Sequence, residues 1–414
     1  MADGVDSRMY DFGAGKSAIR TVFEQTCELR QQGVHDFWDF SIGNPDVPAP
    51  PEVDDAIREV LAELDPIDVH GYPPNNGWLT TRQAVAANLN RRFGARARAS
   101  EIAMTGGCAG AITATIAAVT SAGEDVIVPV PYFAEYRMYI QAWNCRCVEV
   151  PTLPRTFQLD LDAIERAIGP TTRMVIVNTP NNPTGAIYTD ESLRELGALL
   201  RRKSRELGQT IYLLSDEPYR EIVYDGRQSS WVADHYENTI VCYSWSKSLS
   251  LAGERVGYVW VPSTVRHARR VYDAILGAQR VVNSICNGLF CRVIERCVDL
   301  PAPVAAYERK RDALYAGLTR IGYDVVHPDG AFYLWVRALE RDDDAFQERA
   351  ANEERLFVVG SEDFAARGYF RLSYCVSDDA IEKSLPAFER LFRSYGGYQW
   401  QADEPMLPRL RCAS

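Results

Sequence analysis

SWSKSLSLAGERVGY, residues 244–258, is the most informative stretch of this chain. It begins at the end of a short apolar run, TIVCYS (239–244), which has the length and β-branched content of a strand. Lys247 therefore follows a predicted strand, with serine hydroxyls beside it and Arg255 eight residues further on. A lysine amine can form an imine with a carbonyl cofactor, and hydroxyls with a guanidinium can hold a phosphate. An exposed lysine in an ordinary turn stays open as the alternative for this stretch taken alone.

Further short apolar runs place that strand in a sheet. They are rich in Val and Ile and end in polar residues, as strands do. Helix-like segments, such as 190–207, separate several of them, which implies crossover connections and parallel pairing. We therefore predict an α/β fold whose large domain holds a mostly parallel sheet flanked by helices. The runs are DVIVPV (125–130), RMVIVN (173–178), TIYLLSD (210–216) and RVGYVWV (255–261).

Polar residues follow three of these predicted strands: the run before Lys247, described above, and two others. NTPNNPTG occupies 178–185, and Asp216 ends the run before Tyr219. Ligands of open parallel sheets bind beyond the carboxyl ends of the strands, so these loops are expected to face one crevice. A buried carboxylate needs a partner, and a protonated pyridine nitrogen would suit Asp216. A capping role for Asp216 and a plain connecting loop at 178–185 are the open alternatives.

After about residue 300 the pattern changes to that of a smaller α+β domain. A helix is expected over 303–320 and another from 378, with short strands near 331–336, 356–359 and 369–374. The predicted division is an N-terminal arm that packs with the small domain (1–43), a large domain (44–300), the small domain (301–395) and an irregular tail (396–414).

Composition excludes several classes of protein. Hydrophobic residues make up 46% and charged residues 24% of the chain, as in globular proteins. The formal net charge of −11 disfavours nucleic acid and anionic membranes as partners. Residues 1–13 lack a basic segment followed by an apolar run, so a cytoplasmic location is expected. The ten cysteines lack paired CxxC spacing, so we expect reduced, mostly buried thiols and no metal site.

The order of these motifs resembles the class I and II aminotransferases of pyridoxal-phosphate (PLP) fold type I, from about residue 19 to 395. The resemblance implies that Lys247 carries PLP as a Schiff base and then moves the substrate proton as the catalytic base. It implies that Asp216 binds the pyridinium nitrogen of the cofactor. Asn182 and Tyr219 match the pair that hydrogen-bonds the phenolic oxygen of the cofactor.

The resemblance also supplies the remaining cofactor contacts. Ser244, Ser246 and Arg255 match phosphate ligands, as do the backbone N–H groups of Gly107, Cys108 and Ala109 in TGGCAGAI (105–112). A helix N-terminus suits this task because its N–H groups lack partners. Phe133 in VPYFAEY (130–136) matches the aromatic residue that stacks on the ring. Tyr72 in GYPPNNG (71–77) matches a tyrosine that reaches the neighbouring subunit's cofactor, which implies a homodimer with shared active sites.

The implied reaction moves the amino group of an L-amino acid to a 2-oxo acid. Arg371 in FRLSYCVS (370–377) matches the arginine that binds the substrate α-carboxylate, and Gly43 and Asn182 match residues of the substrate pocket. A PLP-dependent lyase on the same scaffold is the alternative, by C–S β-elimination or by an elimination like that of ACC synthase. Substrate choice stays open between a dicarboxylate and an apolar amino acid. Candidate cations for a dicarboxylate are Arg137 and Arg280, and candidate apolar residues are Tyr10, Phe12, Trp78 and Phe332.

Overall fold

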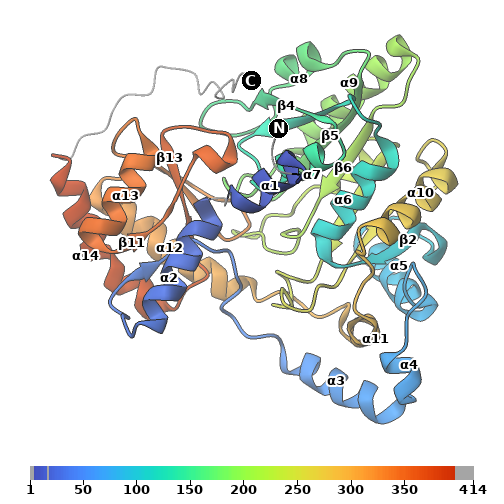
Figure 1. The fold of residues 1–414 in the computed structure, drawn as a ribbon, viewed down its shortest axis with the longest axis horizontal. Helices are drawn as coiled ribbons and strands as arrows, with labels where there is room; N and C mark the ends of the chain where they lie inside the picture. The colour runs from blue at the N-terminus through green and yellow to red at the C-terminus, as the bar shows by residue number, and fades with distance from the viewer. Residues whose placement is uncertain (1–3, 16–17, 397–414) are drawn as a thin grey trace.

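A seven-stranded sheet with the order β2-β8-β7-β6-β5-β3-β4 forms the centre of the larger part of the molecule (Figure 1). The structure is a computed structural model that describes residues 4–15 and 18–396. Every neighbouring pair from β4 to β7 is parallel, and β8 runs antiparallel to both of its neighbours. The predicted mostly parallel α/β sheet is confirmed. Its strands are β2 (Ile102–Thr105), β3 (Asp125–Val130), β4 (Arg146–Pro151), β5 (Thr172–Asn178), β6 (Tyr212–Asp216), β7 (Thr239–Ser244) and β8 (Gly257–Trp260).

Helices cover both faces of this sheet. Alternate residues of β5 enter different cores: Met174 and Ile176 pack with α6 and α10, whereas Val175 and Val177 pack with α8 and α9. A strand buried on both faces reads as a continuous apolar run, which explains why these strands stand out in the sequence. The helices are α6 (Gly107–Val119), α7 (Glu135–Ala142), α8 (Leu161–Ala167), α9 (Asp190–Leu207) and α10 (Ala268–Val281).

A third core lies at the β2–β8 edge of the sheet, where Tyr258 and Trp260 pack against further helices. Cys286 and Cys291 form a disulfide in this region, so the expectation of reduced cysteines is wrong for this pair. The first turn of α11 brings Cys291 back towards Cys286, which lies just before the helix begins. The elements here are α3 (Pro51–Glu63), α4 (Pro66–His70), α5 (Leu79–Phe93), α11 (Gly288–Cys297) and two short 3-10 helices, Ala99–Glu101 and Val232–Asp234.

A second, four-stranded antiparallel sheet with the order β12-β13-β10-β9 occupies the other side of the molecule (Figure 1). The N-terminal segment packs beside it, because α2 contacts β12 and β1 pairs with β11 in a separate two-stranded sheet. These elements are α1 (Ser7–Ala14), α2 (Ala18–Gln31), β1 (Trp38–Asp39), α12 (Val304–Ile321), β9 (Val325–Val326), β10 (Tyr333–Arg337), α13 (Asp343–Glu354), β11 (Leu356–Phe357), β12 (Val359–Gly360), a 3-10 helix (Glu362–Phe364), β13 (Tyr369–Ser373) and α14 (Asp378–Ser394).

The loop after β6 connects the two sheets. Tyr219, Ile222 and Tyr224 are buried in the core of the four-stranded sheet, only a few residues after Asp216 ends a strand of the seven-stranded one. The exact division into domains stays a prediction, and residues 397–414 of the predicted tail lie outside the described residues. None of the described helices is long and apolar enough to cross a membrane.

Candidate active site

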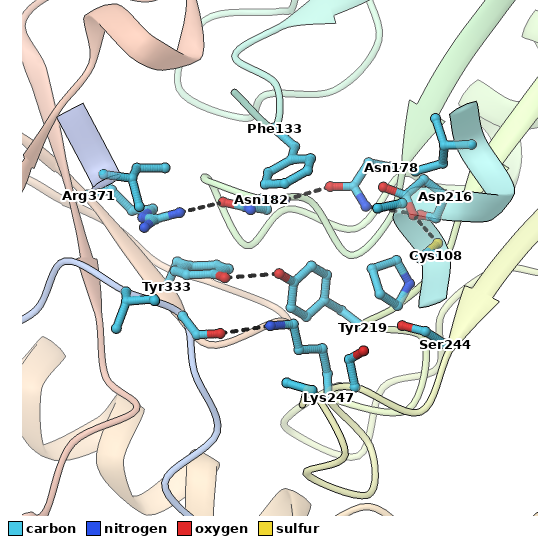
Figure 2. A pocket seen from close by; sticks show the side chains of 18 of the residues that line it. Cys108, Phe133, Asn178, Asn182, Asp216, Tyr219, Ser244, Lys247, Tyr333 and Arg371 are labelled. Carbon is cyan, nitrogen blue, oxygen red and sulfur yellow. Dashed lines mark hydrogen bonds between the residues drawn. The ribbon is translucent and has the colours of Figure 1, made fainter. Parts of the chain in front are cut away.

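A pocket of about 240 Å³ lies beyond the carboxyl ends of β5, β6 and β7, between the two sheets. Residues far apart in the chain meet there and point towards one another (Figure 2). The structure therefore brings together most of the site residues that the sequence predicts. Those that line the pocket are Gly43, Cys108, Ala109, Phe133, Asn182, Asp216, Tyr219, Ser244, Ser246, Lys247, Arg255 and Arg371.

Lys247 reaches the pocket from the turn that follows β7. Its Nζ atom donates a hydrogen bond to the carbonyl oxygen of Gly43 at 2.7 Å (Figure 2). Burial of the amine lowers the pKa of Lys247 to about 8, and the nearby Arg371 and Arg255 lower it as well. A lysine with a depressed pKa has more of the neutral, nucleophilic amine at neutral pH. Lys247 is thus suited to covalent bonding with a carbonyl carbon.

Asp216 ends β6 and is only 3% exposed. Oδ1 accepts a hydrogen bond from Cys108 Sγ at 2.9 Å, and Oδ2 accepts one from the Tyr136 hydroxyl. Burial raises the pKa of Asp216 to about 6, and the bonds from Cys108 and Tyr136 oppose that rise. Among the described residues, no lysine or arginine forms an ion pair with this carboxylate. A buried carboxylate without a cation is costly, so a ligand with a positive end would be stabilised here.

Arg371 on β13 supplies a buried cation at the opposite side of the pocket. Nη1 donates to Asn182 Oδ1 at 3.2 Å, and Nη2 donates to the carbonyl oxygen of Ser41. Its Nε atom is buried and has no hydrogen-bond partner in the described part of the chain. The guanidinium lies over the ring of Tyr333, at 4.5 Å from its centroid. A carboxylate is the ligand that this guanidinium, which has only neutral hydrogen-bond partners, would bind best.

A third polar group lies where α6 begins. The Arg255 guanidinium lies against Gly107, where an added Cβ would come within 2.8 Å of Nη2. Gly107 has a φ of +77°, so glycine suits both the backbone and the space. Ser244 and Ser246 line the same pocket. A helix N-terminus combined with a guanidinium and two hydroxyls can bind a phosphate.

Several lining residues are absent from the sequence prediction. Tyr333 shares a hydrogen bond with Tyr219 at 2.9 Å between their hydroxyl oxygens. The residue expected from the sequence, Phe332, lies just before β10, is fully buried and does not line the pocket. Asn178 was noted only as the start of its loop. The others that line the pocket are Ile19, Ile42, Ile112, Pro218 and Ala252, and nothing in their local sequence signals a site.

Some candidate residues lie elsewhere. Tyr72 is fully exposed and does not line the pocket, and Gly107 lies next to the lining residues Cys108 and Arg255 without lining the pocket itself. Arg137 forms an ion pair with Glu149, and Arg280 is exposed near the end of α10. Neither arginine lines the pocket.

Comparisons with known proteins are consistent with this geometry. The family model for aminotransferase class I and II matches residues 35–388. Aspartate/prephenate aminotransferase of Thermus thermophilus is 33% identical over 385 residues, which is 91% of this chain and 96% of that protein. The crystal structure of an amino transferase from Eubacterium rectale has a TM-score of 0.91 and 44% identity, and covers 95% of this chain and 100% of that one. Aspartate aminotransferase from Thermus thermophilus with maleate has a TM-score of 0.84 and 31% identity, over 94% and 100% of the two chains.

Proposed function

The chain belongs to the class I and II aminotransferases, and from this membership we propose the roles of its pocket residues. It is a pyridoxal-phosphate enzyme that transfers an amino group from an amino acid to a 2-oxo acid. The relatives do not favour the lyase alternative. One observation carries the proposal: the amine of Lys247, the carboxylate of Asp216 and the guanidinium of Arg371 all line one pocket.

The donor set of the pocket fits pyridoxal phosphate. Its aldehyde would bond the Lys247 amine, and its ring nitrogen would lie against Asp216, whose buried charge has no internal cation. Its phosphate would bind beside Arg255, where the missing Cβ of Gly107 leaves space for the guanidinium. Ser244, Ser246 and the first N–H groups of α6 would supply the remaining phosphate contacts. When bound, the cofactor supplies an electron sink for the negative charge that develops at the substrate Cα.

The protein's own residues would then hold the substrate and move one proton. Lys247, once its amine is released, is the base that takes the proton from the substrate Cα. The lowered pKa supports this role, because a base works best when its pKa is near the working pH. Tyr219 and Asn182 would hold the phenolic oxygen of the cofactor, and Phe133 would pack on its ring. Arg371 would hold the substrate α-carboxylate, which fixes the Cα–H bond relative to Lys247.

We propose further that the amino donor has an apolar or aromatic side chain. The described cations that line the pocket are Lys247, Arg255 and Arg371, and each has a proposed partner. The lining that is left for the side chain is largely apolar and includes Ile19, Ile42 and Tyr333. The names of the relatives span aspartate/prephenate and aromatic-amino-acid aminotransferases, so they leave this choice open.

We also propose a cytoplasmic homodimer with shared active sites. Tyr72 is fully exposed in the single chain, and Ile67 is 80% and Val281 75% exposed. Apolar side chains with such exposure are suited to burial against a second copy. In that copy Tyr72 would reach the cofactor phosphate, as the resemblance implies.

An absorbance titration of the holoenzyme tests these proposals. Apolar, aromatic and acidic L-amino acids are added in turn, and ammonia is assayed in parallel. Conversion of the cofactor band by apolar or aromatic donors, without ammonia, is the expected result. A marked preference for aspartate or glutamate would instead point to a cation from the second subunit. Loss of the cofactor band in Lys247→Ala, with an unchanged far-ultraviolet circular dichroism spectrum, is the expected control.

A further inference from the structure

Cys108 makes a contact that a phosphate-binding loop does not require. The resemblance assigns only its backbone N–H to the phosphate, whereas its thiol donates to Asp216, 2.9 Å from Oδ1 (Figure 2). Cys108 is 8% exposed and lines the pocket. Burial raises the pKa of the thiol well above its usual range, and the charge of Asp216 raises it further. The sulfur is therefore a protonated donor, and the carboxylate is its acceptor.

The surroundings of Asp216 make this donor important. The Tyr136 hydroxyl from α7 binds the other oxygen, Oδ2. Tyr139 of α7, Tyr219 of the following loop and Cys242 of β7 also face the carboxylate, and all three are neutral in their usual protonated forms. Asn178 of β5 donates to the backbone oxygen of Asp216 and not to its side chain. The charge on Asp216 is therefore stabilised by two hydrogen bonds, one for each oxygen.

We propose that Cys108 is a positioning residue that holds Asp216 in its charged form and fixes its direction towards the cofactor nitrogen. The inference rests on the proposed role of Asp216. The thiol donates to Oδ1 at 2.9 Å, and a carboxylate oxygen can accept more than one hydrogen bond, so the bond from Cys108 does not prevent a ligand from binding. Without this donor the carboxyl takes up a proton at higher pH and no longer offers a charge to the ring nitrogen.

The chain contains a matched control for the loss of a buried sulfur. Cys242 on β7 is also fully buried, and it pairs with Asp216 in the register of the sheet. Its Sγ lies 3.8 Å from the Thr115 hydroxyl and makes no hydrogen bond with Asp216. Cys242→Ala therefore removes a buried sulfur next to the same carboxylate without removing a donor from it.

The test is an infrared pH titration of the Asp216 carboxyl in the full chain stripped of cofactor, with Asp216→Asn to identify its band. Cys108→Ala is expected to move the midpoint upward by about half to one pH unit, which corresponds to the free energy contributed by one hydrogen bond. Cys108→Ser keeps a donor and is expected to restore the midpoint, and Cys242→Ala to leave it unchanged. An unmoved midpoint in Cys108→Ala, or an equal shift in Cys242→Ala, would overturn the proposal.

Cofactor affinity as a function of pH, measured by fluorescence quenching, is the second readout. In Cys108→Ala the affinity is expected to weaken on acidification at a higher pH than in the parent, because the anionic partner of the ring nitrogen is lost earlier. The infrared result does not depend on the reaction that the enzyme catalyses. If Asp216→Asn binds cofactor as tightly as the parent, the proposed role of Asp216 fails. A shift of the Asp216 titration in Cys108→Ala would still show that the Cys108 thiol stabilises the charged carboxyl in that case.

Discussion

Asp216 and Glu217 are consecutive residues at the end of β6, both almost fully buried, and their charges are stabilised in different ways. Glu217 accepts a hydrogen bond from Ser215 at 2.6 Å and pairs with Arg220 at 3.2 Å, inside the protein. Asp216 has only the neutral donors Cys108 and Tyr136. Burial raises the pKa of both carboxyls, and only Glu217 has a buried cation that opposes it.

The difference separates a structural ion pair from a ligand site. A buried pair that is complete within the fold contributes to one arrangement of the chain and offers nothing to a ligand. A buried carboxylate without a cation stores an unfavourable energy that a cationic ligand atom can relieve. The same fold thus holds two adjacent acids, and the location of the nearest cation distinguishes their roles. Four predictions test this contrast, from the largest expected effect to the smallest.

Asp216→Asn is expected to lower the rate of the amino-donor half-reaction by about 10²–10³-fold, because the ring nitrogen loses its anionic partner. Stopped-flow absorbance of the holoenzyme with its best donor measures this rate in a single turnover. A rate within tenfold of the parent would contradict the role proposed for Asp216.

Arg220→Ala is expected to lower the free energy of unfolding by about 3–5 kcal/mol, because Glu217 is left as a buried charge without its cation. Urea denaturation followed by circular dichroism measures the loss. Arg227→Ala is the matched control, since Arg227 pairs with Asp329 at 3.0 Å but is 57% exposed. We expect that control to change stability by less than about 1 kcal/mol. Equal losses in the two variants would argue against a special role for the buried pair.

Asp216→Asn should also stabilise the chain when the cofactor is absent. The folded pKa of about 6 lies above the ordinary value of 3.8, so the folded state holds its proton more tightly than the unfolded state. The loss of stability caused by burying the charged Asp216 carboxyl is small below about pH 4, grows as pH rises, and is complete above about pH 6. Urea denaturation of the two cofactor-free proteins should show a gain on the order of 3 kcal/mol at pH 8 and little at pH 4. A variant that is less stable than the parent at pH 8 would remove the contrast between the two acids.

Glu217→Gln is expected to cost only about 1–2 kcal/mol of stability, because Arg220 keeps Glu221 as a partner at 3.3 Å. The donor half-reaction is expected to stay within a few-fold of the parent rate. The same two assays measure both quantities. A large loss of rate with little loss of stability would place Glu217 in the chemistry and not in the scaffold.

Strand positions were predictable because both faces of the large sheet are buried. The run TIVCYS, for example, coincides with β7, and the helix at 190–207 coincides with α9. Asp216, Lys247 and Arg371 were predictable as a set, because strand ends of a parallel sheet converge and the motif order resembles one family. Their meeting in one pocket follows from the topology and from their order in the chain.

Contacts between distant segments were not predictable. The sequence points to Cys108 only for its backbone N–H in the phosphate loop, and the bond from its thiol to Asp216 depends on the placement of α6 against β6. Tyr136 and Tyr333 reach the site from elements whose local pattern resembles any amphipathic helix or buried strand. Tyr72 is fully exposed in the single chain, so its proposed contact with a second copy is not visible in one subunit.

Two of the pocket residues that face the proposed substrate side chain come from the N-terminal segment of the chain. Ile19 belongs to α2 and Ile42 follows β1, and neither segment is part of the seven-stranded sheet that holds Asp216 and Lys247. Mutations there can alter the choice of amino acid while the reacting groups stay in place. New donor preferences could therefore evolve, or be selected in a library, through the N-terminal arm alone and at little cost to foldability.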